Sequence, residues 1–157
     1  MPWKNQSLEV TIERAKKIIL KELNLQITSE LFTCSKDEMI GRCTDELKEK
    51  IKDEKILNRE IMRLAYIYGK YFAGTNEIWV VEKIGENIDV LIHEMIHSIQ
   101  VCKPNREGIV DYLTFKFTKN ESWINSKIIE DWRKIEKMVG LQAIKEKIVK
   151  NEDCEEF

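Results

Sequence analysis

Apolar residues recur every three or four positions near the start of the chain, a spacing that places them on one face of a helix. These positions are Leu8, Ile12, Ala15, Ile19 and Leu23. The pattern predicts a helix over about 8–22, with Ser7 as its N-cap. Apolar and polar residues then alternate over 25–28, which predicts a short strand, and a loop is expected around Gly41 over 33–43.

The middle of the chain changes from helical periodicity to short β-forming runs. Thr44 begins a charged helical stretch that extends to about Tyr68, with one break near 53–55. Two runs rich in β-forming residues follow, over 69–72 and 77–82, and a glycine-containing turn joins them. We therefore expect two strands here.

Helical patterns dominate the region that follows. Asn87 marks the start of a helix over 88–101. Pro104 should end this helix, because proline disfavours helical backbone in the residue before it and donates no backbone hydrogen bond. Asn105 is a good N-cap for the next helix, over about 106–118.

A last long helix is expected near the C-terminus, with Asn120 as its cap. Its apolar face should contain Ile124, Ile128, Trp132, Ile135 and Met138. Gly140 should kink this helix before a final segment over 141–150. The acidic tail, 151–157, has no such periodicity and should be frayed.

The size and composition of the chain suit one globular domain over residues 1–157. The chain is 43% hydrophobic and 34% charged, which excludes a disordered protein. We predict an α+β fold in which a small, mostly antiparallel sheet packs beside the helix over 88–101. The C-terminal half should be helical.

Charge and cysteine content indicate the binding partners and the cellular compartment of the protein. The net charge of −2 is spread along the chain without a basic stripe, so nucleic-acid binding has little support. No segment reads as a signal peptide or as a membrane span of about 20 apolar residues, so we expect a cytoplasmic protein. In a reducing cytosol the cysteines should be free thiols, with a Cys34–Cys43 disulfide as the alternative. The other two are Cys102 and Cys154.

Both histidines of the chain lie in one run of five residues, His93-Glu94-Met95-Ile96-His97. Residues four apart share a face of a helix, so both imidazoles can reach one metal ion. This H-E-x-x-H pattern is typical of zinc hydrolases, in which the glutamate takes a proton from a metal-bound water. The pattern also arises by chance, and the histidines would then simply bond to nearby carboxylates.

A catalytic zinc site needs a third protein ligand. Lys103 excludes a third histidine six residues after the motif, and Cys102 should lie on the opposite face of the helix. Glu107, in the first turn of the next helix, is the preferred ligand. Asp111 lies on the same face and would accept a hydrogen bond from the first histidine. The reverse assignment of these two carboxylates remains open.

These residues resemble the gluzincin clan of zinc metallopeptidases. Members of this clan combine H-E-x-x-H with a glutamate helix that often reads E-G-x-x-x-Y or E-x-x-x-D, and the segment Glu107-Gly108-Ile109-Val110-Asp111-Tyr112 satisfies both patterns. The small size is similar to that of single-domain minigluzincins. Nine residues separate His97 from Glu107, about half the number in the best-known gluzincins, so the link must be a tight helix–loop–helix.

The resemblance implies a zincin-like metallopeptidase acting on a peptide or protein substrate. Zn²⁺ would be held by His93, His97 and Glu107, with Glu94 as general base and acid. The segment Gly74–Val80 resembles the gluzincin edge strand that pairs with bound peptide. Its expected substrate-binding residues are Glu77, Ile78, Trp79 and Val80.

Two aspects of this interpretation stay open. No residue is matched to the family's transition-state tyrosine or histidine, because Tyr112 lies ~140° around the helix from Glu107. The alternative function is a catalytically inactive or latent zincin-fold protein that binds or regulates a partner. The sequence does not indicate the oligomeric state.

Overall fold

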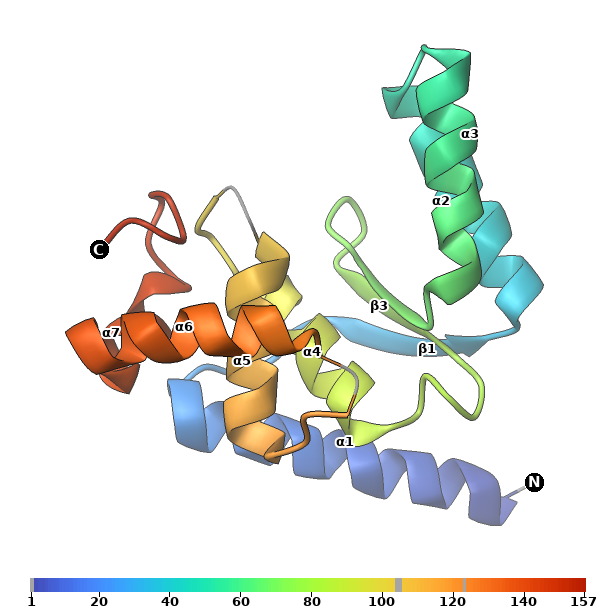
Figure 1. Ribbon diagram of the computed structural model, residues 1–157. Helices are drawn as coiled ribbons and strands as arrows, with labels where there is room; N and C mark the ends of the chain where they lie inside the picture. Colours follow the sequence, from blue (N-terminus) through green and yellow to red (C-terminus); the bar gives the residue numbers. More distant parts are fainter. Residues whose placement is uncertain (1, 104–105, 123) are drawn as a thin grey trace.

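The computed structural model describes residues 2–103, 106–122 and 124–157 (Figure 1). In these residues, seven α-helices surround one three-stranded sheet, which confirms the predicted α+β class. Most of the fully buried apolar side chains form one core, in which helix α4 (Ile88–Ile99) is central. No helix in the described ranges is long and apolar enough to span a membrane.

The first helix and the first strand differ from the prediction. Helix α1 spans Pro2–Leu23, so Ser7 lies inside it and is not its cap. The alternating segment 25–28 is not a strand; strand β1 is Glu30–Cys34 instead. The physical reason is pairing, because β1 forms its ladder with strand β3 (Glu77–Val81), whereas none of the described strands lies beside 25–28.

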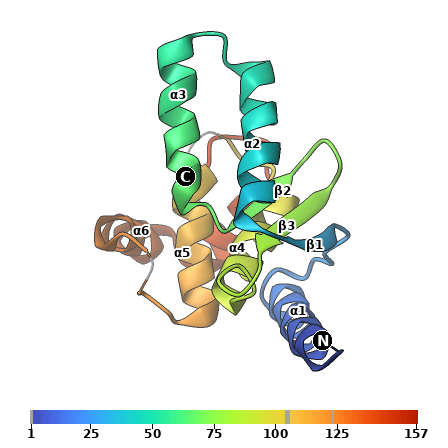
Figure 2. The ribbon, with the colours of Figure 1, turned by 90° about the vertical axis from the view of Figure 1, so that its right-hand side faces the viewer.

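A helical arm follows β1 and projects from the body of the molecule (Figures 1 and 2). It consists of α2 (Lys36–Lys50) and α3 (Glu54–Arg63), and the short 3-10 helix η1 (Leu64–Tyr66) continues from α3. The loop expected over 33–43 is therefore wrong. Ser35 and Glu38 form a reciprocal capping box that starts α2, and this sequence signal was missed.

The break predicted within the arm is confirmed. Helix α2 ends at Lys50, and the Asp53 side chain caps α3 by accepting hydrogen bonds from the backbone of Lys55 and Ile56. Two helices can therefore pack antiparallel in place of one long helix.

The sheet is mixed and has the order β1-β3-β2. Strand β2 (Gly69–Phe72) and β3 occupy the predicted positions and pair antiparallel. Strand β1 pairs parallel with β3, because the chain crosses over through the arm and β2 before it reaches β3. The expectation of a mostly antiparallel sheet is wrong in this respect.

Helix α4 has one face in the core and one face towards a cleft. Its fully buried residues are Leu91, Ile92, Met95 and Ile96. Burial of each such side chain stabilises the fold by roughly 1.5–3 kcal/mol. Asn87 caps the helix as predicted, but the helix ends at Ile99, well before Pro104, so proline is not what terminates it.

Three helices follow α4 in the described residues, as predicted. Helix α5 spans Arg106–Thr118, whereas its expected cap, Asn105, lies outside the described residues. Helix α6 spans Ser126–Val139 and is followed by α7, Leu141–Lys147. Gly140, with φ of +86°, separates them as expected.

The start and the apolar face of α6 need correction. Asn125 caps the helix, whereas Asn120 donates a hydrogen bond to Asp89 at the start of α4. Ile124 therefore precedes the helix, and Met138 is 82% exposed, so neither belongs to a continuous apolar face. Trp132 is buried as predicted.

The C-terminal tail is docked, so its predicted fraying is wrong. Cys154 is fully buried and forms a disulfide with Cys102, and Lys103 pairs with Asp153 in a short β-bridge. The predicted free thiols are therefore wrong for this pair. Cys34 and Cys43 are buried and free, so the alternative disulfide between them is not formed.

Candidate metal centre

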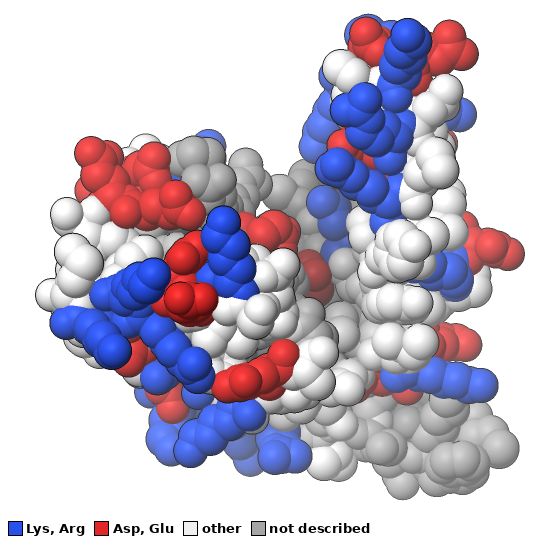
Figure 3. Space-filling view, viewed as in Figure 1, with Lys and Arg blue, Asp and Glu red and all other residues white. Residues whose placement is uncertain are grey.

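A cleft of about 1020 Å³ runs between the arm and the body of the protein. The space-filling view shows the arm standing apart from the body on this side (Figure 3). Residues of α2, β2, α4, α5 and the loop after α4 line the cleft. The lining includes all five candidate polar residues of the motif region: His93, Glu94, His97, Glu107 and Asp111.

Three of these residues bring donor atoms together at one point. His93 Nε2 and His97 Nε2 are 3.2 Å apart. The Glu107 carboxylate lies against both rings, with one oxygen 3.1 Å from His93 Nε2 and the other 3.0 Å from His97 Nε2. These residues form a group that could hold a metal ion.

The spacing and chemistry of this group can be compared with those of a known metal centre. Zinc bonds to histidine nitrogen and carboxylate oxygen at about 2.0–2.2 Å, so tetrahedral ligand atoms lie about 3.3 Å from one another. The three separations of 3.0–3.2 Å are close to that value. Two imidazoles and one carboxylate also form a donor set used by catalytic zinc. The residues present fit a zinc ion.

The position of Glu107 follows from the packing of α5 on α4. Ile109, Val110 and Leu113 are fully buried, which turns the opposite side of α5 towards the cleft. Gly108 permits this packing, because a Cβ atom there would lie 3.0 Å from the Trp132 indole nitrogen of α6. The nine-residue connection is therefore long enough for the glutamate to reach both histidines.

Asp111 lies one helical turn after Glu107 and contacts the other side of the first imidazole. Its Oδ1 is 3.1 Å from His93 Nδ1, so the ring can direct Nε2 towards the donor group. Of the two assignments left open, these distances support Glu107 as the ligand and Asp111 as the acceptor from His93.

Gln100 has the corresponding position beside the second imidazole, and sequence reasoning missed it. Its Oε1 is 3.0 Å from His97 Nδ1. The available signal was its spacing, because a residue three positions after His97 can reach back to it at the end of the helix.

The electrostatics of this cluster favour a positive charge on His93. Burial lowers the pKa of His93, but hydrogen bonds with Asp111 and Glu107 outweigh burial, and Glu94 adds to them, raising the pKa to about 10. Burial raises the pKa of Glu107, but hydrogen bonds with His93 and His97 outweigh it and hold that pKa below its usual range. Without a metal, the carboxylates therefore retain a proton on His93, and a metal ion can replace this positive charge.

Glu94 lies beside the donor group and under strand β2. Its side chain is 9% exposed, and Oε1 is 3.8 Å from His93 Nε2. A Cβ atom at Gly69 would lie 2.7 Å from Val90 Cγ1 and 3.0 Å from Glu94 Cγ. The absence of a side chain at Gly69 therefore lets β2 lie directly against α4.

The substrate-pairing residues expected on β3 need correction. Strand β3 is the central strand, so β1 and β2 occupy both of its edges, and Glu77, Ile78, Trp79 and Val80 have no edge available for a peptide. Among the described residues, β2 has a neighbouring strand on one side only, and it lines the cleft. The Val81 backbone donates to Tyr68, so the alternating ladder turns the backbone groups of Gly69 and Tyr71 towards the open edge.

Tyr112 is remote from this chemistry. It is fully buried, its hydroxyl donates to Glu136 at 3.0 Å, and its ring stacks on Trp132. The hydrogen bond and burial raise the pKa of the Tyr112 hydroxyl, burial more strongly. It is a core residue, which agrees with leaving it unmatched to the transition-state tyrosine.

Comparison of the chain with protein families, with characterised proteins and with solved structures finds no match. The function of this site is therefore inferred from its own residues. The resemblance to gluzincins stays a prediction.

Proposed function

We propose that this protein is a zinc-dependent metallopeptidase with a zincin-like fold. One observation carries the proposal: two imidazoles and a carboxylate meet within 3.0–3.2 Å of one another beside Glu94. The group lies in a cleft that is open to a substrate. Chance occurrence of H-E-x-x-H does not require a third donor and two supporting acceptors in these positions.

The proposed ligands are His93, His97 and Glu107. When bound, zinc would lower the pKa of its water ligand towards about 7 and polarise a substrate carbonyl. The nitrogen-rich donor set favours zinc over calcium or magnesium, which prefer oxygen ligands.

The residues around the ligands would orient groups and move protons. Asp111 and Gln100 would accept hydrogen bonds from the Nδ1 atoms, which would keep both Nε2 lone pairs directed at the ion. Glu94 would accept the proton of the attacking water on its carboxylate and deliver it to the leaving amine. Its low exposure helps it to stay in place between these two transfers.

Strand β2 is the proposed element for substrate alignment. Its open edge at Gly69 and Tyr71 can pair with an extended peptide, which β3 cannot do from the centre of the sheet. The cleft volume of about 1020 Å³ is at the upper end of the range for small-molecule sites, about 300–1,000 Å³. A peptide or protein substrate fits a cleft of this size.

The test compares Glu94→Gln with Glu130→Gln, which makes the same chemical change on an exposed side chain of α6. Zinc content is measured by elemental analysis, and cleavage of a mixed peptide library is followed by mass spectrometry. We expect both variants to retain zinc, and Glu94→Gln to lose cleavage by about 10²–10⁴-fold. Full activity of Glu94→Gln would refute the mechanism.

The second candidate function is a latent or inactive zincin-fold protein with a binding or regulatory role. The observation that favours it is the position of Tyr112, which is buried in the core and unable to stabilise a transition state in the cleft. Stoichiometric zinc without chelator-sensitive cleavage would support this candidate. A cytoplasmic location stays a prediction, and the disulfide is more typical of an oxidising compartment.

A further inference from the structure

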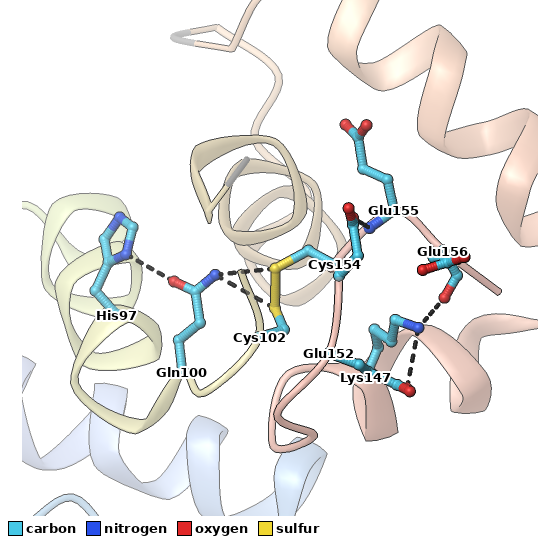
Figure 4. The surroundings of a disulfide bond; sticks show 9 residues. His97, Gln100, Cys102, Lys147, Glu152, Cys154, Glu155 and Glu156 are labelled. Atoms are coloured by element: carbon cyan, nitrogen blue, oxygen red, sulfur yellow. Dashed lines mark hydrogen bonds and ion pairs between the residues drawn. A yellow bond between two sulfur atoms is a disulfide. The ribbon is translucent and has the colours of Figure 1, made fainter. Parts of the chain in front are cut away.

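We propose that Gln100 is a positioning residue that couples the redox state of the Cys102–Cys154 disulfide to the hydrogen bond that orients the His97 ring. This inference rests on the metal site proposed above. Figure 4 shows the three parts in line: the His97 ring, the Gln100 amide and the two sulfur atoms. Through these contacts, the redox state of the disulfide would control the affinity of the site for metal.

The first contact fixes the oxygen end of the Gln100 amide. For His97 to present an Nε2 lone pair to a metal ion, its Nδ1 must carry a proton and donate it. The acceptor within reach is Gln100 Oε1, at 3.0 Å. His93 differs, because its Nδ1 faces the Asp111 carboxylate, which can only accept when ionised.

The second contact fixes the nitrogen end of the same amide. Gln100 Nε2 donates to the sulfur of Cys102 at 3.5 Å and to the sulfur of Cys154 at 3.6 Å. Disulfide sulfurs have no hydrogen and can only accept. The oxidised pair therefore selects the amide orientation with the NH₂ group on the sulfurs and the oxygen on His97.

The tail provides a firm support for this disulfide. The Lys147 ammonium is buried and donates to the Glu152 carboxylate at 3.0 Å and to the Glu156 carbonyl. Phe157 packs edge-on against Trp132. The disulfide therefore ties the loop after α4 to a segment that is already held by contacts of its own.

Reduction changes the polarity of the sulfurs. A dithiol reductant supplies two electrons and two protons, the S–S bond breaks, and the products are two cysteine thiols and one oxidised reductant. Each thiol can now donate its S–H, whereas the Gln100 atom beside the sulfurs is Nε2, which is itself a donor. Reversal of the amide would bring Gln100 Oε1 to the thiols, so the thiols would compete with His97 for this oxygen.

The expected consequence is weaker metal binding in the reduced protein. Loss of a hydrogen-bond partner of a metal-bound histidine typically lowers metal affinity by about 10–100-fold. We expect a decrease of this size on reduction, whereas the backbone hydrogen bonds from Val101 and Cys102 to Ile148 keep the loop near its place. The protein would thus bind metal tightly in its oxidised form and loosely in its reduced form.

The test measures zinc affinity by competition with a chromophoric chelator. Oxidised protein is compared with protein reduced by a phosphine, which is removed anaerobically before the titration. In the wild type, reduction should weaken zinc binding by about 10–100-fold. Gln100→Met should bind weakly in both states. Gln100→Glu should restore tight binding in both states, because a carboxylate accepts from His97 whatever the sulfurs do.

Two controls separate this coupling from a loss of structure. Cys102→Ser/Cys154→Ser should show no response to the phosphine. Circular dichroism checks that each form is folded. Equal zinc affinity in the two redox states of the wild type would overturn the proposal, and so would a full redox response in Gln100→Met.

A metal-independent readout separates this proposal from the proposed function. The side-chain amide NMR signals of Gln100, identified by their loss in Gln100→Met, should shift on reduction in the metal-free protein. If the oxidised protein binds no zinc, the proposed function fails while these signals still report the contact with the sulfurs. Signals that do not respond to reduction would overturn the coupling.

Discussion

Raising the pH should destabilise the metal-free protein through His93. The pKa of this histidine is about 10 in the folded protein and 6.5 ordinarily, so folding holds a proton that unfolding releases. This contribution to stability is complete below pH 6.5, the ordinary pKa, and it is lost as the pH rises through the folded-state pKa of about 10. Glu107 acts in the opposite sense, because its lowered pKa contributes stability above about 4.5 that is lost as the pH falls.

The size of this destabilisation follows from the shift in the pKa of His93. Between pH 6.5 and about 8.5, each pH unit should lower the free energy of unfolding by up to about 1.4 kcal/mol, giving a total of about 2 kcal/mol, because the slope is smaller near pH 6.5. The His93 side chain is 13% exposed, so solvent screening reduces the effect little. A loss of this size is a large fraction of the roughly 5–15 kcal/mol that stabilises a typical domain.

Urea unfolding at several pH values in the presence of a chelator measures this dependence. Asp111→Asn removes an ionised acceptor from His93 and should flatten the curve, whereas Glu130→Gln on the exposed side of α6 should leave it unchanged. Saturating zinc should remove this loss of stability, because binding requires the unprotonated imidazole and the folded state then holds no proton to release. A flat curve in the wild type, or equal slopes in the wild type and Asp111→Asn, would refute the electrostatic account.

The remaining predictions concern the ligands and the edge strand. Glu107→Ala should weaken zinc binding by a few hundred-fold, because a structural zinc site shares about 10–16 kcal/mol of binding among its four protein ligands, or about 3–4 kcal/mol for each. Asp111→Ala should cost only about 10–100-fold, and equal losses in a chelator competition would contradict the assignment. Gly69→Ala should retain zinc but lose peptide cleavage, because its Cβ would lie 2.7 Å from a side chain of α4. Gly74→Ala, where nothing lies within 4 Å of a Cβ, is the matched control; equal cleavage rates in the two variants would argue against alignment by β2.

Much of the candidate site was predictable from local spacing. The two histidines share a face because they are four residues apart in a helix whose other face is apolar, and Glu107 and Asp111 are related in the same way. The hairpin of β2 and β3 was predictable from its β-forming runs. These features depend on residues that are near one another in the chain.

Apart from the local capping box at Ser35, which was missed, the main errors fall where structure depends on distant partners. Strand β1 forms only because it can pair with β3, far along the chain, so local alternation at 25–28 was misleading. The position of β3 at the centre of the sheet follows from the same pairing, and it moves the open edge to β2. The tail is ordered because Cys154 reaches Cys102 across 52 residues.

The sequence by itself determined most of the helices, the shared face of the two imidazoles, and the short list of carboxylates able to join them. Only the tertiary structure decided that the Glu107 carboxylate meets both rings, that β2 borders Glu94, and that Gln100 lies between His97 and a disulfide. The physical reason is that periodicity orients side chains around one element, whereas packing between elements sets the distances on which coordination and proton transfer depend.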